Sequence, residues 1–142
     1  GRGLYGAGAT RATYERVCEL ARAVVASGRV AILDGTFLLR WQRDLARSLA
    51  AGLRVPFAIL AFEARPETLR RRILARSLAG SDASEADLAV LAHQLTTRDP
   101  LGSDEMRDVV ACDADAPLAQ AFDPETWRDV RERLWPSSAG PA

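Results

Sequence analysis

The chain of 142 residues is long enough for about one domain, and its 48% hydrophobic and 27% charged residues are ordinary for a globular protein. Nineteen basic residues balance nineteen acidic ones, so net charge offers no long-range attraction for nucleic acid or membranes, and no apolar run approaches the ~20 residues of a membrane helix. Cys18 and Cys112 are few and far apart, which argues against a disulfide framework or a zinc site and predicts a reducing, cytoplasmic setting.

The N-terminal segment GRGLYGAGAT is rich in glycine, but it follows no strand pattern and lacks the G-K-[ST] ending of a phosphate-binding loop. We therefore expect an ordinary loop there. From Thr10 the apolar residues recur at helical spacing, and Ser27-Gly28 supplies a stop for that helix. Its predicted apolar face consists of Tyr14, Val17, Cys18, Ala21, Val24 and Val25.

The next segments alternate between strand and helix patterns. Val30–Leu33 is an apolar run that predicts a first, covered strand ending at Asp34. A helix is expected over about Leu38–Ala51, with Gly52 closing it. Further strands are expected at about 55–62 and 108–112, and further helices at 66–80, 85–95 and 123–135, with Ser84 and Asp87 forming a capping box.

Strands that alternate with helices of ten or more residues predict an α/β fold, with a parallel sheet covered by helices on both faces. We assign residues 1–135 to this fold and expect residues 136–142, PSSAGPA, to form a disordered tail. In such sheets ligands bind beyond the carboxyl ends of the strands. Asp34 lies at such an end, where it could hold a metal ion or simply end the strand and begin a turn.

All 19 basic residues are arginine, so this stretch contains neither a Schiff-base lysine nor a phosphate-loop lysine. Arg72 and Arg76 are four residues apart and project from one helix face, where a pair of guanidinium groups suits phosphate oxygens. The same pattern also describes a solvated helix with cations near its C-terminal end. The polar loop over residues 80–84 could close over a nucleotide.

The segments V-A-I-L-D-G-T-F, L-L-R-W-Q-R-D, L-R-R-R-I-L-A-R and H-Q-L-T-T-R-D-P-L occur here in order. Together they resemble the C-terminal two-thirds of the small P-loop kinases, over about Gly3 to Asp113. The nearest group is the predicted ATP-binding kinase domains that are often fused to an aminoglycoside-phosphotransferase-like domain. The 5′-kinase domain of polynucleotide kinase and the gluconate kinases are similar at greater distance.

The resemblance implies a role for several residues. Asp34 takes the position of the Walker-B-like acid beside magnesium and the phosphates, and Thr36 lies near the phosphates or the acceptor. Arg72 and Arg76 match the lid arginines that clamp phosphates. Arg40 and Arg43 match arginines that either contact substrate or pair with acids, and Gln94 matches a glutamine either near the nucleotide base or on the helix surface.

The resemblance also implies that the first strand, the phosphate-binding loop with its lysine, and the general base belong to an N-terminal part of the same domain that precedes this region. That first strand would lie between Val30–Leu33 and the strand at about 55–62, so these two strands would not pair directly. This chain by itself is then expected to be inactive.

The predicted function is therefore part of a phosphotransferase that uses ATP and Mg²⁺ to transfer the γ-phosphoryl group to a hydroxyl acceptor. A nucleotide-binding regulatory module without transfer activity and a degenerate structural α/β domain remain as alternatives. The acceptor, the oligomeric state and any fused domain are not encoded in these patterns.

Overall fold

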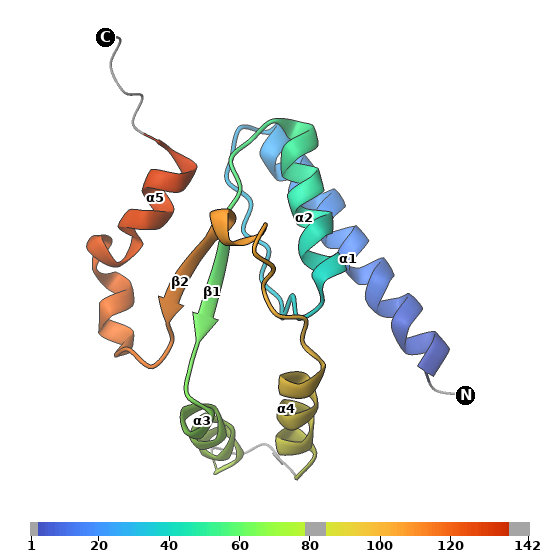
Figure 1. Cartoon of the computed structure of the whole chain (residues 1–142), viewed down its shortest axis with the longest axis vertical. Helices are drawn as coiled ribbons and strands as arrows, with labels where there is room; N and C mark the ends of the chain where they lie inside the picture. The colour runs from blue at the N-terminus through green and yellow to red at the C-terminus, as the bar shows by residue number, and fades with distance from the viewer. Residues whose placement is uncertain (1–2, 79–84, 137–142) are drawn as a thin grey trace. The chain divides into compact units, whose positions relative to one another are not determined.

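The computed structural model describes residues 3–78 and 85–136, with side chains described over 8–75 and 89–136. The chain divides into two compact units, residues 1–55 and 56–142, which are described separately. Figure 1 labels the helices and strands of both units. In the part of the chain that the structure describes, no helix is long and apolar enough to cross a membrane.

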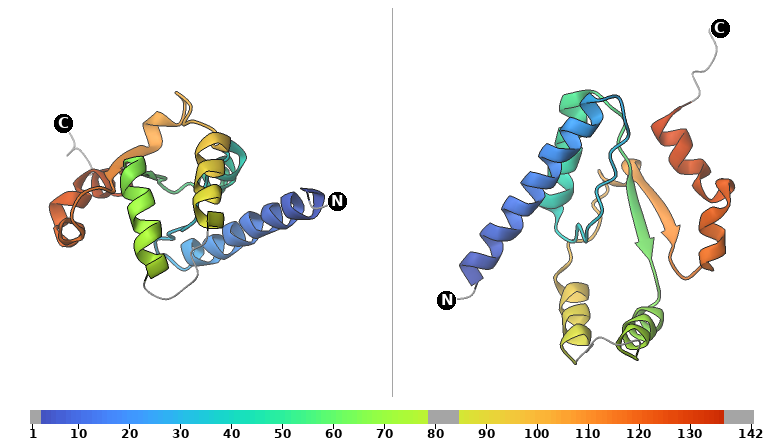
Figure 2. Two further views of the ribbon diagram at one scale, coloured as in Figure 1. Left: turned by 90° about the horizontal axis from the view of Figure 1, so that it is seen from below. Right: turned by 180° about the vertical axis from the view of Figure 1, so that it is seen from behind.

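The first unit consists of two helices, α1 (Gly3–Ala26) and α2 (Arg40–Leu53), joined by the irregular segment 27–39. The two helices pack side by side in every view (Figures 1 and 2). Most of the predicted apolar face of α1 is buried or half-buried, with Ala21 only 6% exposed, while Val24 lies at the margin with 38% exposed. Helical spacing of apolar residues therefore identified the packed face correctly.

The loop predicted over residues 1–10 is wrong, because α1 already begins at Gly3. Each glycine costs a helix about 1 kcal/mol relative to alanine. Adding residues to a helix that has already formed is nevertheless far easier than starting one. The strongly periodic segment after Thr10 supplies that nucleus, so the helix extends back through the glycines.

The strand predicted at Val30–Leu33 is also not formed. These residues are irregular backbone, and Val30 and Ile32 are 52% and 86% exposed. An apolar run becomes a strand only when a neighbouring backbone completes its hydrogen bonds. The two-stranded sheet of the described residues provides no partner for this segment.

Helix α2 ends later than predicted. Gly52 lies within the helix, and Arg54 takes the left-handed conformation at the C-cap, with φ 54° and ψ 44°. Its backbone N–H bonds the carbonyl of Ala51 at 3.1 Å. A left-handed residue after a helix is usually glycine, so the sequence predicted the helix end at Gly52 rather than at Arg54.

The second unit contains a parallel pair of strands, β1 (Ile59–Glu63) and β2 (Val109–Asp113), which lie side by side in Figure 1. The register pairs Ile59 with Val109 and Glu63 with Asp113. The predicted strands at 55–62 and 108–112 are confirmed in existence and direction, with shifted ends. Parallel pairing requires a crossover connection, here α3 (Pro66–Leu78) and α4 (Glu85–Thr97), so the class is α/β.

After β2 the chain continues through short turns into a last helix. Two 3₁₀ helices, η2 (Leu118–Phe122) and η3 (Pro124–Trp127), precede α5 (Arg128–Leu134), and η1 (Met106–Asp108) comes before β2. The single helix predicted over 123–135 is therefore divided. Asp123 caps η3 by accepting from Glu125 N at 3.0 Å. The predicted capping residue Ser84, the loop 80–84 and the tail 137–142 lie outside the described residues.

Polar side chains contribute as much to the interior as apolar ones. Among the side chains that the structure describes, the buried apolar ones are Ala21, Ala50 and Val110. The buried polar ones are Gln42, Arg43, Thr68 and Glu105. Buried polar groups are costly unless they are hydrogen-bonded, and Gln42, Arg43 and Glu105 each make such bonds.

Two glycines offer a matched test of these backbone conformations. A Cβ at Gly52 or Gly28 would meet nothing within 4 Å, but Gly28 has φ +79° and Gly52 is helical. We expect Gly52→Ala to raise the free energy of unfolding by about 0.5–1 kcal/mol and Gly28→Ala to lower it by about 1–2 kcal/mol. Urea denaturation of the two variants measures both, and equal stabilisation by both would contradict the left-handed assignment.

Candidate functional site

The segment Asp34–Leu39 connects the irregular residues after α1 to the start of α2. Asp34 and Thr36 are both exposed, and their side chains are separated by Gly35. Asp34 makes no hydrogen bond or ion pair with any described residue. Its carboxylate is thus presented to solvent, as an acid that serves a ligand would be, and the simple turn interpretation also remains compatible with this position.

Arg43 fixes the second half of this segment. Its side chain is 5% exposed, and its Nη1 donates to the carbonyl oxygens of Phe37 at 3.1 Å and Leu38 at 3.2 Å. Gln42 is also buried and accepts from Leu39 N through Oε1 at 3.0 Å, which covers the first turn of α2. Consecutive residues of one helix therefore hold consecutive residues of the segment that precedes it.

Tyr14 of α1 holds the first half. Its hydroxyl oxygen lies 3.2 Å from Thr36 Oγ1 and accepts from Phe37 N at 3.3 Å. Its ring packs edge-on against Phe37 and Trp41, with centroids 5.0 and 5.6 Å away. The Arg11 guanidinium lies 5.3 Å from the centroid of Trp41, at cation–π distance. Both helices therefore contribute to one aromatic cluster that supports the segment.

The backbone of this segment is strained at one residue. Phe37 has φ +42°, which is uncommon for any side chain other than glycine, asparagine or aspartate. A Cβ on Gly35 would lie 3.4 Å from Phe37 Cε2, so a side chain there would crowd the ring. Such conformations persist only where the surroundings hold them, and here the Tyr14 hydroxyl bonds the Phe37 N–H and Arg43 bonds the Phe37 carbonyl.

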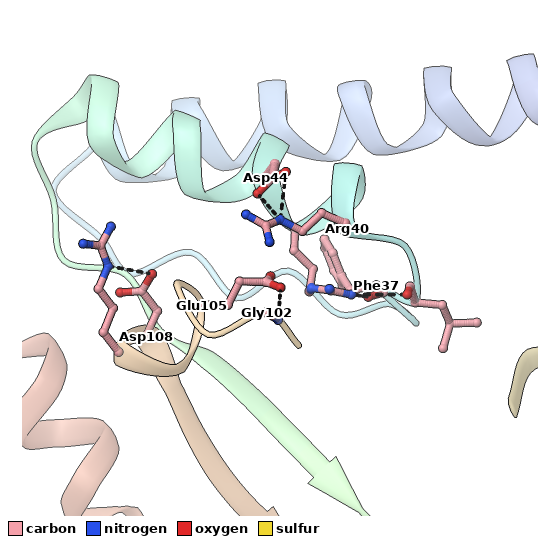
Figure 3. Close-up of polar contacts among 9 residues, drawn as sticks. Phe37, Arg40, Asp44, Gly102, Glu105 and Asp108 are labelled. Atoms are coloured by element: carbon pink, nitrogen blue, oxygen red, sulfur yellow. Dashed lines mark hydrogen bonds and ion pairs between the residues drawn. The ribbon is translucent and has the colours of Figure 1, made fainter. Parts of the chain in front are cut away.

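Arg40 and Arg43 behave differently, although the sequence treated them alike. Arg40 Nε donates to both carboxylate oxygens of Asp44, at 3.1 and 3.2 Å, and its side chain is 40% exposed (Figure 3). Of the two alternatives given for Arg40, contact with substrate or pairing with an acid, the structure shows pairing with an acid. Arg43 donates to backbone carbonyls of the segment, a contact that neither alternative anticipated.

In the second unit, polar groups gather at the carboxyl ends of β1 and β2. Glu63 and Asp113 end the two strands in register, and Asp115 follows two residues later. Asp115 Oδ2 accepts from both N and Nε of Arg65, each at 3.0 Å. These residues line an open pocket of about 500 Å³. The edge predicted to bind ligands is therefore polar and concave in this unit.

The Asp115 carboxylate is stabilised in its charged form. The Thr68 side chain contributes most to lowering its pKa, followed by the Arg65 backbone N–H, while burial opposes both. Oδ1 is buried and makes no hydrogen bond of good geometry with the described residues. The Thr68 hydroxyl therefore acts on the carboxylate without completing an ideal hydrogen bond.

The predicted lid residues lie on α3. Arg72 is exposed, and its Nη2 donates to the Ala114 carbonyl at 2.6 Å, which connects α3 to the segment after β2. Arg76 is one helical turn later on α3, and its side chain lies outside the described set. Gln94 is half-buried on α4. Convergence of Asp34 and Thr36 with these arginines on one cleft stays a prediction.

The acid at position 34 fits magnesium in one particular way. No group of three His, Cys, Asp or Glu side chains that could hold a metal occurs in the described parts of the chain. Magnesium is commonly bound through one or two carboxylates, several waters and substrate phosphates rather than by a cage of protein ligands. An exposed single carboxylate such as Asp34 fits that mode.

The two cysteines are free and half-buried, as the sequence suggested. Burial raises the pKa of both the Cys18 and the Cys112 thiol. A raised pKa keeps a thiol protonated and unreactive at neutral pH. Both therefore act as small packing residues.

Parallel strands joined by a helical crossover, with polar carboxyl ends, define an α/β domain of the kind that binds ligands at the strand ends. A family model described as an AAA domain matches residues 2–101, well over half of the chain. The chain belongs to this family, a group of P-loop nucleotide-binding domains. No match to the chain was found among curated proteins or among solved structures.

Tyr14 and Gln42 were missed as site residues by sequence reasoning. Tyr14 was counted only in the apolar face of α1, because periodicity cannot show where a hydroxyl points. Gln42 carried a usable signal, since glutamine at the third helical position often accepts from the N-cap N–H. Tyr14 contacts Thr36 and Phe37, which lie 22 and 23 positions further along the chain. A local sequence pattern does not reveal contacts at that separation.

Arg43 and Arg40 form a matched pair for stability. We expect Arg43→Ala to lower the free energy of unfolding by about 2–4 kcal/mol, because it removes a charged donor from two carbonyls. Arg40→Ala should change it by no more than about 0.5 kcal/mol, since exposed ion pairs contribute little. Urea denaturation tests both, and equal effects would contradict the anchoring role of Arg43.

The Asp115 carboxylate predicts an acid-dependent loss of stability. Its folded-state pKa lies below the ordinary value of 3.8, so its stabilisation is present above pH 3.8 and is lost as the pH falls through the folded-state pKa. We expect Thr68→Val to flatten this loss, because the Thr68 side chain is the largest single cause of the lowered pKa. Melting temperature measured against pH tests this, and an unchanged pH profile in Thr68→Val would contradict it.

Proposed function

We propose that this chain is part of an ATP-binding phosphotransferase that moves the γ-phosphoryl group of ATP to a hydroxyl acceptor. The observation that carries the proposal is the presentation of Asp34 and Thr36, both exposed, on a segment fixed by Tyr14 and Arg43. Membership of a P-loop nucleotide-binding family supplies the substrate class. Phosphoryl transfer relies on positioning and on electrostatic stabilisation, which a rigid segment favours.

Within this proposal Asp34 holds magnesium beside the phosphates of the nucleotide. When bound, the ion would supply positive charge that offsets the negative charge developing on the phosphates. Thr36 lies two residues further along and offers a hydroxyl near the same group. Arg43 serves by holding the backbone of this segment rather than by contacting substrate, a role supported by its burial and its two carbonyl contacts.

Arg72 and Arg76 are proposed to clamp the phosphates from α3. Arg72 is exposed, and its planar guanidinium group has donors beyond the Nη2 that bonds Ala114, which suits contact with phosphate oxygens. Arg40 and Gln94 are proposed to contact the nucleotide or the acceptor. Both are partly exposed, which is compatible with such a role.

We further propose that residues 1–135 form the C-terminal part of one kinase-like domain with a sheet covered on both faces. Strand β1 bonds β2 along one edge, and parallel sheets of two strands are rarely stable alone. The outer edge of β1 therefore suits a further parallel strand. We assign that strand, with the phosphate-binding loop, to an N-terminal part of the same domain, and we place the protein in the cytoplasm because its thiols are free.

The proposal is tested by incubating the full-length protein that contains this chain with γ-labelled ATP and a panel of hydroxyl acceptors. We expect label to appear on one acceptor class. Arg72→Ala should slow this transfer by about 10³-fold, because arginines at the transferring group stabilise its charge. Asp34→Asn should raise the Mg²⁺ concentration for half-maximal transfer by about 10–100-fold.

Arg71→Ala and Glu19→Gln are the matched controls, since both residues are exposed and lie outside the proposed site. Both should leave transfer and magnesium dependence unchanged. ATP binding without label transfer to any acceptor would favour a regulatory nucleotide-binding module. Absence of ATP binding would leave a structural α/β domain.

A further inference from the structure

Tyr14 contacts the candidate segment at two consecutive residues. Its hydroxyl oxygen lies 3.2 Å from Thr36 Oγ1 and 3.3 Å from Phe37 N. The ring is half-buried between Phe37 and Trp41, so the hydroxyl has little freedom to move away. Phenylalanine would fill the same space as the tyrosine ring. What tyrosine adds at this position is the hydroxyl, which contacts Thr36 and Phe37.

One of the two contacts has a fixed direction. The Phe37 N–H can only donate, so the phenol oxygen accepts from it. Either hydroxyl can donate in the contact between Tyr14 and Thr36. When the phenol donates, the threonine hydroxyl keeps its own proton for another partner, and Thr36 is an exposed residue.

We propose that Tyr14 is a positioning residue that turns the Thr36 hydroxyl outward as a hydrogen-bond donor to a phosphate oxygen of the bound nucleotide. This inference rests on the proposed function and adds a residue from α1 to it. A preoriented donor needs no reorganisation when charge develops on the phosphoryl group. Tyr14 itself does not touch the ligand and acts through Thr36.

The surroundings of Thr36 agree with such a role. Phe37, the next residue, is held at φ +42° with its N–H on Tyr14 and its carbonyl on Arg43. Strain of this kind, held by contacts from two helices, is typical of functional segments.

A double-mutant cycle in the full-length protein tests the inference. Tyr14→Phe keeps the ring and removes the hydroxyl, and we expect it to lower kcat by about 3- to 10-fold with little change in KM for ATP. Thr36→Val should lower kcat by at least as much, and Thr36→Ser should restore most of it. The double variant Tyr14→Phe/Thr36→Val should be no slower than Thr36→Val alone.

Thr13→Val is the matched control, because it removes a neighbouring hydroxyl of α1 that bonds only its own helix, at the Ala9 carbonyl. It should leave kcat unchanged. Multiplicative losses in the double variant, or an unchanged kcat for Tyr14→Phe, would overturn the inference while the wild-type activity upholds the proposed function.

If no acceptor is phosphorylated, the same variants can be compared by their affinity for Mg-ATP, measured by calorimetry. This measurement tests the role of Tyr14 independently of phosphoryl transfer. Loss of affinity in Tyr14→Phe that vanishes in the Thr36→Val background would support the positioning role without transfer activity. Independent losses of affinity would overturn that role. A wild-type protein that neither binds Mg-ATP nor transfers phosphate would overturn both the proposed function and this inference.

Discussion

The contact between the buried Arg43 guanidinium and the carbonyls of Phe37 and Leu38 is the constraint on which the first unit depends. It fixes where the irregular segment enters α2 and so determines where Asp34 and Thr36 emerge. A guanidinium group suits this task because its planar donors span neighbouring acceptors without a change of charge at any working pH. With Tyr14 on the other side, the peptide of a strained residue is held from two helices.

The second unit uses a different principle. Its two strands run parallel, so their carboxyl ends meet at one edge, and each ends in an acid. Arg65 and Arg72 each donate to groups just beyond β2, which joins α3 to the end of the sheet. Charged groups at this edge thereby stabilise the crossover that makes the parallel arrangement possible. Arg65 also lines the open pocket there, together with Glu63, Asp113 and Asp115.

Sequence patterns predicted helices at 66–80 and 85–95, which form over 66–78 and 85–97, and also the parallel pair of strands, because these depend on local periodicity and punctuation. The patterns wrongly predicted a strand at Val30–Leu33, where the apolar run lacks a neighbouring strand to bond. They also wrongly predicted a loop near Gly3, where α1 extends through glycines that have low helix propensity. Asp34 was singled out by its place after an apolar run and Thr36 through the resemblance to P-loop kinases, and their roles stay predictions. Tyr14 was not singled out, because its contact joins residues 22 positions apart and depends on how two helices pack.

The segment Val30–Leu33 has a consequence for association between chains. It is irregular backbone, and Val30 and Ile32 are 52% and 86% exposed. A short stretch of branched apolar residues without charge is the kind that pairs between chains. Arg29 and Asp34, which flank it, are placed as charged gatekeepers against that outcome.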